Sequence, residues 1–389
     1  MSRYIWQRPT WPRWKWSEPA LNDLLHTVQR KRDYLAGLAA GLDPEHANRV
    51  VAELSTQETV ATSAIEGVKL DPDLVRSSIM RRLGLGVSKD HEERIGAAAR
   101  GVIDVLADST QNLAPLTLER LFAWHTAIFP AGRSGLVPLL VGMLRGAEPM
   151  QVVSGAYGRE KVHYEAPPRK RLDNDMKQFL KWLHASTTMD PTLRACIAHL
   201  WFETLHPFED GNGRLGRAAS DLTLAQGAGF HSQRTGRLWA VSPVFLKRRK
   251  DYYQQLERAQ KGDLDITEWL QWSVSCVDVA YDGARECIER VGQVARFWTR
   301  HRELPFNARQ HRALEVALSA NGPEEQWLTA RRIVKLSKAA PVTASRDLAQ
   351  LEEWGVIRKD PKAGGRSTRY FVMLDEPKAP RLIRDLSWK

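Results

Sequence analysis

The chain has 389 residues, of which 43% are hydrophobic and 26% are charged. This composition is typical of a globular protein with a buried core, and it excludes a disordered or fibrous chain. The formal net charge is +11, and residues 301–389 contain 17 Lys and Arg against 11 Asp and Glu. A basic C-terminal region makes nucleic acid a candidate partner there, with a merely solvated basic surface as the alternative.

The cysteine content and the hydropathy suggest where the protein resides. Cys196, Cys276 and Cys287 have no metal-ligand spacing, and unpaired thiols suit a reducing cytoplasm. No run of 18 or more apolar residues occurs, so the sequence predicts no transmembrane helix and no membrane partner. The first residues are rich in Trp and Arg and lack the apolar stretch of a secretory signal.

Residues 1–18 contain Trp6, Trp11, Trp14 and Trp16 among prolines. Proline disfavours a helix, and this much aromatic area is rarely left in water. We therefore expect an extended arm that packs on a helical core, with a membrane-interface or oligomer contact as the alternative. Residues 20–46 and 46–85 follow as predicted helices, with Gly67 as an expected helix end.

The next part of the chain predicts two helices and then a β-hairpin. Glu92–Asp108 and Leu116–Phe129 have helical periodicity. Met150–Gly155 and Lys161–Ala166 are short runs of strand-forming residues joined by residues 156–159. A hairpin on a helical body has a free edge that another strand can join. A purely structural hairpin is the alternative.

The loop His206–Arg217 lies between the predicted helices Thr192–Leu205 and Gly213–Gln226, and a further helix, Leu172–His184, precedes them. The loop His206–Arg217 contains one imidazole, two carboxylates, three glycines and two guanidiniums. Glycines at a helix start expose backbone N–H groups that bind anions. Arg214 and Arg217 are three residues apart, so they share a helix face and can grip phosphate oxygens.

Two other side chains complete this chemistry. Asp210 beside a phosphate site suits a Mg2+ ion that keeps its waters and bridges to a nucleotide. His206 is a candidate general base at neutral pH. Base, metal ligand, anion cradle and cationic clamp together indicate phosphoryl or nucleotidyl transfer.

Two better-known loops are excluded. An EF-hand loop beginning at Asp210 would have Arg214 at its fifth position and Asp221 at its twelfth, and this does not meet the ligand pattern. No Gly-Lys-Ser/Thr follows the glycines, so the loop is not a Walker loop.

His206–Arg217 is similar to the Fic family signature, His-Pro-Phe-x-Asp/Glu-Gly-Asn-Gly-Arg-x-x-Arg, at every fixed position. The resemblance covers about residues 50–290 and implies a mainly α fold, with a helical Fic core and a β-hairpin flap. The family usually transfers AMP from ATP to a hydroxyl side chain of a target protein. By this resemblance His206 is the catalytic base and Asp210 holds Mg2+. The implied nucleotide-binding residues are Asp210, Gly211, Asn212, Gly213, Arg214, Leu215, Gly216, Arg217, Tyr252, Tyr253 and Gln260.

These assignments differ in their support. The Gly211–Gly213 backbone with Asn212 would cradle the phosphates, and Arg214 and Arg217 would hold the β- and γ-phosphates. Tyr252, Tyr253 and Gln260 would lie near the adenine and ribose, although relatives commonly have Asn where this chain has Gln260. By the same resemblance the flap residues Val162, His163, Tyr164 and Glu165 receive the target's peptide as an added strand.

A second motif precedes the core. Thr62-x-x-x-Glu66-Gly67 matches the Fic inhibitory-helix motif, Ser/Thr-x-x-x-Glu-Gly/Asn. Taken alone, Glu66 would be an ordinary surface carboxylate. The resemblance implies that it pairs with Arg217 and occupies the guanidinium that the γ-phosphate needs.

The rest of the chain predicts helices from Val241 to Gly262 and two closing helices within Ile266–Phe297. Residues 305–375 then resemble a winged helix-turn-helix. Its expected helices and strands are Arg309–Ser319, Leu328–Leu336, Val342–Gly355, Val356–Ile357 and Tyr370–Val372, with a basic wing over Asp360–Arg369 and a tail from Pro377 to Lys389. Binding of DNA and contact with another protein both stay open.

These observations give one leading hypothesis and two alternatives. The leading hypothesis is an autoinhibited protein adenylyltransferase that uses ATP and Mg2+ to modify Ser, Thr or Tyr of a target protein or of itself. The alternatives are removal of AMP from a modified protein, with Glu66 orienting a water, and a DNA-binding regulator with a nucleotide-sensing Fic domain. A homodimer is also left open. The expected domains are a Trp-rich arm and inhibitory segment (1–90), a Fic catalytic core (91–298) and a winged helix with a tail (299–389).

Overall fold

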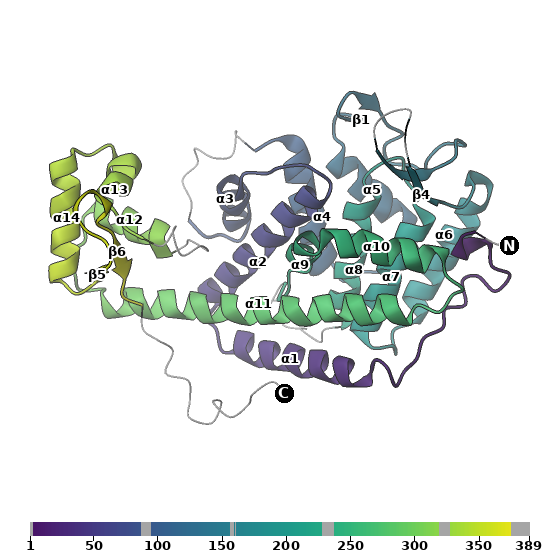
Figure 1. Ribbon diagram of the computed structural model, residues 1–389, viewed down its shortest axis with the longest axis horizontal. Coiled ribbons are helices and arrows are strands. Elements are labelled where there is room, and N and C mark those ends of the chain that lie inside the picture. The colour runs from purple at the N-terminus through teal and green to yellow at the C-terminus, as the bar shows by residue number, and fades with distance from the viewer. Residues whose placement is uncertain are drawn as a thin grey trace. The chain divides into compact units, whose positions relative to one another are not determined.

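The computed structural model describes residues 3–86, 95–155, 159, 161–227, 237–318 and 327–374. This part of the chain is mainly helical, and its strands form small two-stranded antiparallel hairpins, as the sequence predicted. Two compact units are present, Met1–Ile288 and Glu289–Lys389 (Figure 1). Within the described ranges no helix is long and apolar enough to cross a bilayer.

The helices of the first unit are α1 (Asn22–Ala40), α2 (Pro44–Ile65), α3 (Pro72–Arg82), α4 (Ala97–Gln111), α5 (Leu118–Ile128), α6 (Arg169–Ala185), α7 (Pro191–Leu205), α8 (Asn212–Gly227), α9 (Ser242–Lys247) and α10 (Arg249–Lys261). Its strands are β1 (Arg133–Ser134), β2 (Val137–Pro138), β3 (Gln151–Ser154) and β4 (Lys161–Glu165). Helix α11 (Thr267–Arg300) runs through the boundary at Ile288. The second unit adds α12 (Ala308–Leu318), α13 (Ala330–Ser337), α14 (Pro341–Glu353), β5 (Ile357–Lys359) and β6 (Tyr370–Val372).

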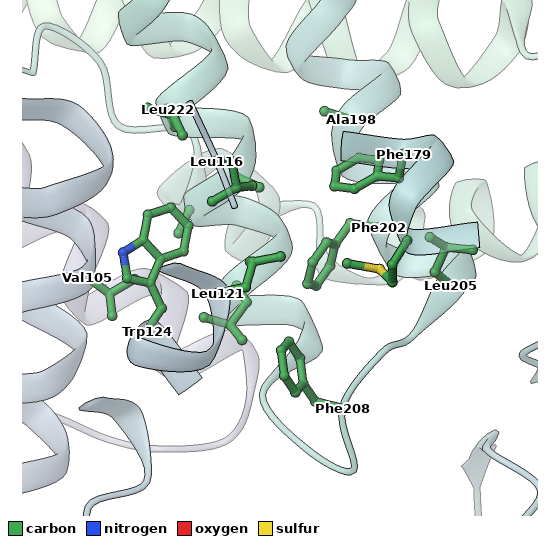
Figure 2. Packing of buried hydrophobic residues seen from close by; sticks show 14 of the residues in the cluster. Val105, Leu116, Leu121, Trp124, Phe179, Ala198, Phe202, Leu205, Phe208 and Leu222 are labelled. Carbon is green, nitrogen blue, oxygen red and sulfur yellow. The ribbon is translucent and has the colours of Figure 1, made fainter. Parts of the chain in front are cut away.

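Helix α7 is the centre of the first unit, and every residue from Thr192 to Leu205 is buried. Most of its side chains are apolar, and a helix with apolar residues on every face belongs in a core rather than on a surface. Phe202 and Leu205 of α7 pack with Phe179 of α6 and Phe208 of the following loop (Figure 2). Because α7 is held on all sides, the position of the residue at its C-terminus is well defined.

The Trp-rich arm packs on this core, as predicted. Trp11 and Trp14 lie edge-on to Trp201, with ring centroids 6.0 and 5.8 Å away. Trp6 donates its indole N–H to the carbonyl of Glu165 at 2.8 Å. A short 3-10 turn, η1 (Ile5–Gln7), interrupts the extended path.

The helix end predicted at Gly67 is confirmed: the backbone turns there at a φ of 80°, and Asp71 then caps α3, so residues 46–85 form two helices. Two other predictions were wrong. The helix expected from Val241 to Gly262 breaks at Arg248 into α9 and α10. The two helices expected within Ile266–Phe297 are one, α11. An interior Gly costs a helix only about 1 kcal/mol, so Gly283 and Gly292 did not end it.

The second unit contains the predicted elements in the predicted order, with boundaries shifted by a few residues. These elements pack around a buried hydrophobic cluster that includes Leu314 of α12, Ile333 of α13, Leu348 of α14 and Ile357 of β5. The wing residue Arg366 has no described side chain, and the turn residues 156–158 and the tail Pro377–Lys389 lie outside the described residues. Binding of DNA stays a prediction.

Candidate active site

The loop His206–Arg217 joins the end of α7 to the start of α8. His206 caps α7 with a left-handed backbone, at a φ of 48°, which is uncommon outside glycine. The guanidinium of Arg145 donates to the carbonyl of His206 at 2.8 Å and to that of Pro167 at 2.6 Å. The backbone N–H of Arg145 also donates to the carbonyl of Pro207. One buried side chain therefore fixes both the loop and the end of β4.

Hydrogen bonds within the loop fix its shape. The side-chain amide of Asn212 accepts from the N–H of Phe208 at 2.9 Å and donates to its carbonyl at 2.8 Å. His125 of α5 stacks on the Phe208 ring, with centroids 4.3 Å apart. Its Nδ1 accepts from Gly142, so Nε2 carries the proton and donates to the carbonyl of Asp210 at 3.2 Å. The Asn212 side chain is thus engaged with the loop itself.

The start of α8 has the features of an anion site. Its first-turn N–H groups are not all satisfied within the helix, and the helix dipole is positive there. Arg214 packs over the Phe129 ring at 4.8 Å and lies 4.0 Å from Asp210. Buried donors, Nε of Arg214 and Nη1 of Arg217, have no hydrogen-bond partner among the described residues. Unsatisfied buried donors beside a helix N-terminus can bind phosphate oxygens.

Arg217 is engaged by the end of α2. Its Nη2 donates to Glu66 at 2.7 Å and to the carbonyl of Thr62 at 3.1 Å, while Nε donates to the Thr62 hydroxyl at 2.7 Å. A side chain at Gly213 would collide with the Glu66 carboxylate. The carboxylate therefore lies directly against the first turn of α8. Burial alone would lower the pKa of Arg217, but Glu66 raises it above its ordinary value. Gly67 ends α2 just after this carboxylate.

His206 is electrostatically tuned by burial, which lowers the pKa of its imidazole. Its Nδ1 lies 3.2 Å from the carbonyl of Glu203 and 3.8 Å from that residue's carboxylate. A carbonyl only accepts, so Nδ1 carries the proton and the lone pair is on Nε2. His206 is therefore neutral near pH 7, with Nε2 free to take a proton.

Glu203 is the main feature that the sequence reasoning missed. Its side chain is buried, and burial raises the pKa of the carboxyl to about 8. Its Oε1 has no hydrogen-bond partner among the described residues. The sequence signal for it was a single acid three residues before His206 in a largely apolar helix.

The remaining predicted nucleotide-binding residues differ in their surroundings. Leu215 is a core residue, and Gly216 lets α8 approach Glu203 closely. Tyr252 is buried, with its hydroxyl 2.8 Å from Nε2 of His199. The exposed Tyr253 reaches the end of α2, and the side chain of Gln260 donates to the carbonyl of Glu203.

The four flap residues lie on β4, which pairs with β3 as predicted. Tyr164 points inward and donates its hydroxyl to the carbonyl of Thr204 at 2.7 Å. His163 lies 2.9 Å from Glu257 of α10 and ties the hairpin to that helix. Val162 pairs with β3, and Glu165 accepts from Gln151 across the hairpin.

The residues present fit a Mg2+ ion better than a metal held by protein alone. No cluster of three or more His, Cys, Asp or Glu that could hold a metal occurs in the described part of the chain. Asp210 is half-exposed beside the anion site, with Oδ1 accepting from the N–H of Gly211. One such carboxylate suits Mg2+, which keeps waters and takes its other ligands from phosphates.

Comparison with known proteins places this site in a family. Residues 115–224 match the Fic/DOC family, and residues 4–85 match a domain of unknown function, DUF4172. A protein adenylyltransferase Fic from Nematostella vectensis is 24% identical over 67% of this chain and 55% of the relative. A probable protein adenylyltransferase from Aquifex aeolicus is 26% identical over 34% of this chain and 37% of the relative.

A uridine 5'-monophosphate transferase from Xanthomonas campestris is 28% identical over 35% of this chain and 26% of the relative. The chain thus spans between about a quarter and just over half of the length of these relatives. A solved Fic family protein from Desulfovibrio desulfuricans covers 94% of this chain and 98% of that structure, with a TM-score of 0.52 and 21% identity. That likeness shows the fold. Residues 115–224, which include the loop His206–Arg217, therefore match the Fic/DOC family, and the chain is distantly similar to protein adenylyltransferases.

Proposed function

We propose that this protein is a nucleotidyltransferase that transfers AMP from ATP to a hydroxyl side chain of a target protein, and that Glu66 holds it inactive. The observation that carries the proposal is the Glu66 carboxylate on Arg217 and against the first turn of α8. An anion already lies where the arrangement is suited to binding one. The similarity to adenylyltransferases supports AMP, and the similarity to a uridine 5'-monophosphate transferase makes UTP the second nucleotide to test.

The described residues suggest how the transfer would proceed. Nε2 of His206 takes the proton of the target hydroxyl, whose oxygen attacks the α-phosphorus as pyrophosphate leaves. Arg214, Arg217 and the first-turn amides of α8 stabilise the negative charge on the phosphates. A Mg2+ ion on Asp210 would neutralise further phosphate charge. Arg145 keeps His206 in place throughout.

Inhibition follows from competition for one cation. The γ-phosphate and Glu66 both require the guanidinium of Arg217, and a charge-assisted pair is one of the stronger hydrogen-bonded interactions. With Glu66 bound, a triphosphate would lose this contact and the space beside Gly213. It would then bind without the alignment that attack on the α-phosphorus requires.

The target is proposed to dock on β3 and β4. The hairpin is a two-stranded sheet, so a third strand can join its edge through backbone hydrogen bonds. Tyr164 anchors this hairpin to α7, only two residues before His206. A docked peptide would therefore be held in register with the base.

The decisive experiment incubates wild type, Glu66→Gly and His206→Ala with α-labelled ATP or UTP, alone and with a cell lysate. We expect label on protein with ATP, strong in Glu66→Gly and weak in wild type, and lost in Glu66→Gly/His206→Ala. Label with UTP in place of ATP would keep the reaction class and change the nucleotide. Equal labelling in wild type and Glu66→Gly would contradict inhibition. No label with either nucleotide in any variant would contradict transfer.

A further inference from the structure

A buried carboxyl group lies directly behind the imidazole of His206. Glu203 is one helical turn before His206 on α7, and its Oε2 lies 3.8 Å from Nδ1 of the imidazole. The side chain of Glu203 is 8% exposed and that of His206 is 17% exposed. Close approach in a site largely sealed from water strengthens any electrostatic effect between them.

The surroundings of Glu203 do not explain it as a structural residue. Its Oε1 has no hydrogen-bond partner among the described residues, although buried carboxyl oxygens are nearly always satisfied. An unpaired buried acid costs stability. It is therefore retained at a cost, beside the residue proposed to move a proton.

We propose that Glu203 is a positioning residue that stabilises the protonated imidazole of His206 and so makes it a stronger base. This inference rests on the proposed function for its catalytic meaning. When Nε2 takes the proton of the target hydroxyl, the imidazole carries one proton on each nitrogen. The Nδ1–H then faces the carbonyl and the carboxyl group of Glu203, and a carboxylate at this distance stabilises the cation.

Other charged and titratable groups face Glu203 from several elements. Arg217 comes from α8, Glu66 from the end of α2 and Tyr252 from α10, while His199 lies one turn earlier on α7. Burial is the largest influence and raises the pKa of Glu203, as does Glu66, while Arg217 lowers it. Removal of Glu66 therefore favours ionisation of Glu203. The same event that frees Arg217 would strengthen His206 as a base.

A first test needs no enzyme activity. The pKa and tautomer of His206 are measured by 15N NMR of labelled histidine side chains in the full chain, with His206→Ala to assign the signal. We expect an Nδ1-protonated neutral form and, in the Glu66→Gly background where ionisation of Glu203 is favoured, a pKa that is lower by about one pH unit in Glu66→Gly/Glu203→Gln than in Glu66→Gly. Glu203→Asp should recover part of the difference. The control Glu53→Gln removes a carboxylate on α2 that pairs with Arg76 of α3, and it should leave the pKa of His206 unchanged.

A second test measures transfer in the Glu66→Gly background. Glu203→Gln should lower kcat at least tenfold with KM for the nucleotide nearly unchanged, and should move the acid limb of the kcat profile to lower pH. A His206 pKa that is the same in Glu66→Gly and in Glu66→Gly/Glu203→Gln would overturn the proposal, whatever the rates. If Glu66→Gly itself transfers nothing, the proposed function fails, and the NMR result still decides whether Glu203 acts on His206.

Discussion

Nη2 of Arg217 lies 2.7 Å from Oε1 of Glu66, across 151 residues of sequence. The guanidinium is almost fully buried and the carboxylate is partly exposed. The two ends of this pair are therefore not equivalent. Arg217 cannot move without disturbing α8, whereas Glu66 sits at the end of α2 and can turn outward. A release mechanism should act on Glu66 and on its support.

Thr62 of the same helix binds the same guanidinium as Glu66, because its hydroxyl accepts from Nε of Arg217 at 2.7 Å. Thr62→Val keeps the volume and removes this bond, which is worth about 1–3 kcal/mol for a charged donor. We expect transfer by the variant to rise about fivefold or more above wild type and to stay below that of Glu66→Gly. The rate of labelling with α-labelled nucleotide measures this.

The matched control is Thr56→Val, on the same helix, because the Thr56 hydroxyl donates only to the carbonyl of Ala52 within α2. It should leave the rate at the wild-type value. A Thr62→Val protein as inactive as Thr56→Val would show that Glu66 alone accounts for the inhibition.

Loss of the Arg145 guanidinium should lower both the stability and the activity of the protein. Arg145→Met keeps most of the volume and leaves the carbonyls of His206 and Pro167 without their donor. Each buried unsatisfied group costs about 1–3 kcal/mol. We therefore expect urea unfolding to show that the free energy of unfolding falls by about 2–6 kcal/mol. In the control Arg169→Met, an exposed pair with Asp173 is lost, and that should cost about 1 kcal/mol or less. Equal losses would contradict the assigned role of Arg145.

Substitution by Ala should cost much more stability at one of two glycines that have similar backbone angles. Gly211 and Gly67 have φ values of 83° and 80°, so Ala at either position is strained by about 1 kcal/mol or more. At Gly211 the new methyl would also lie 2.8 Å from Ile128 and Phe129, whereas at Gly67 it meets nothing within 4 Å. We expect Gly211→Ala to cost about 1–3 kcal/mol more than Gly67→Ala in urea unfolding. A similar cost for both would mean that α5 yields to the methyl group.

The sequence predicted the parts of the site that are local in the chain. The loop His206–Arg217 and the end of α2 at Glu66 are contiguous motifs, and the hairpin follows from two short runs of strand-forming residues. The prediction of two helices within Ile266–Phe297 was wrong because tertiary packing outweighs the local signal in α11. Gly283 favoured a break, yet α11 continues through it because burial of Ala280, Ala284 and Ile288 holds its face together.

The parts that could not be predicted depend on distant contacts with backbone. Arg145 lies in an irregular stretch 61 residues before His206 and bonds carbonyl groups, which every residue carries. No side-chain complementarity pointed to it. The raised pKa of Glu203 and its proposed role likewise depend on its burial by α8 and α10, which only the folded chain reveals. The carboxylate was visible in the sequence, but its surroundings were not.

Those surroundings give Glu203 a distinctive signature in the pH dependence of stability. Burial raises its pKa from an ordinary 4.5 to about 8 in the folded chain. Between these values the folded state binds more protons at Glu203 than the unfolded state, so its contribution to stability falls as pH rises. Glu203→Gln removes this dependence. We therefore expect the free energy of unfolding of the variant, relative to that of wild type, to increase by up to about a few kcal/mol between pH 5 and pH 8.5.

The measurement is urea unfolding of both proteins at pH 5, 7 and 8.5, and their difference at each pH isolates Glu203 from other titrating groups. At pH 5 the folded wild type holds a neutral acid, so the two should be close in stability. At pH 8.5 folded wild type must either bury the ionised carboxylate of Glu203 or keep that carboxyl protonated, and both cost free energy. The glutamine of the variant does not titrate, so the variant has neither cost. A difference that does not change with pH would mean that Glu203 titrates as an exposed carboxylate and that burial does not raise its pKa.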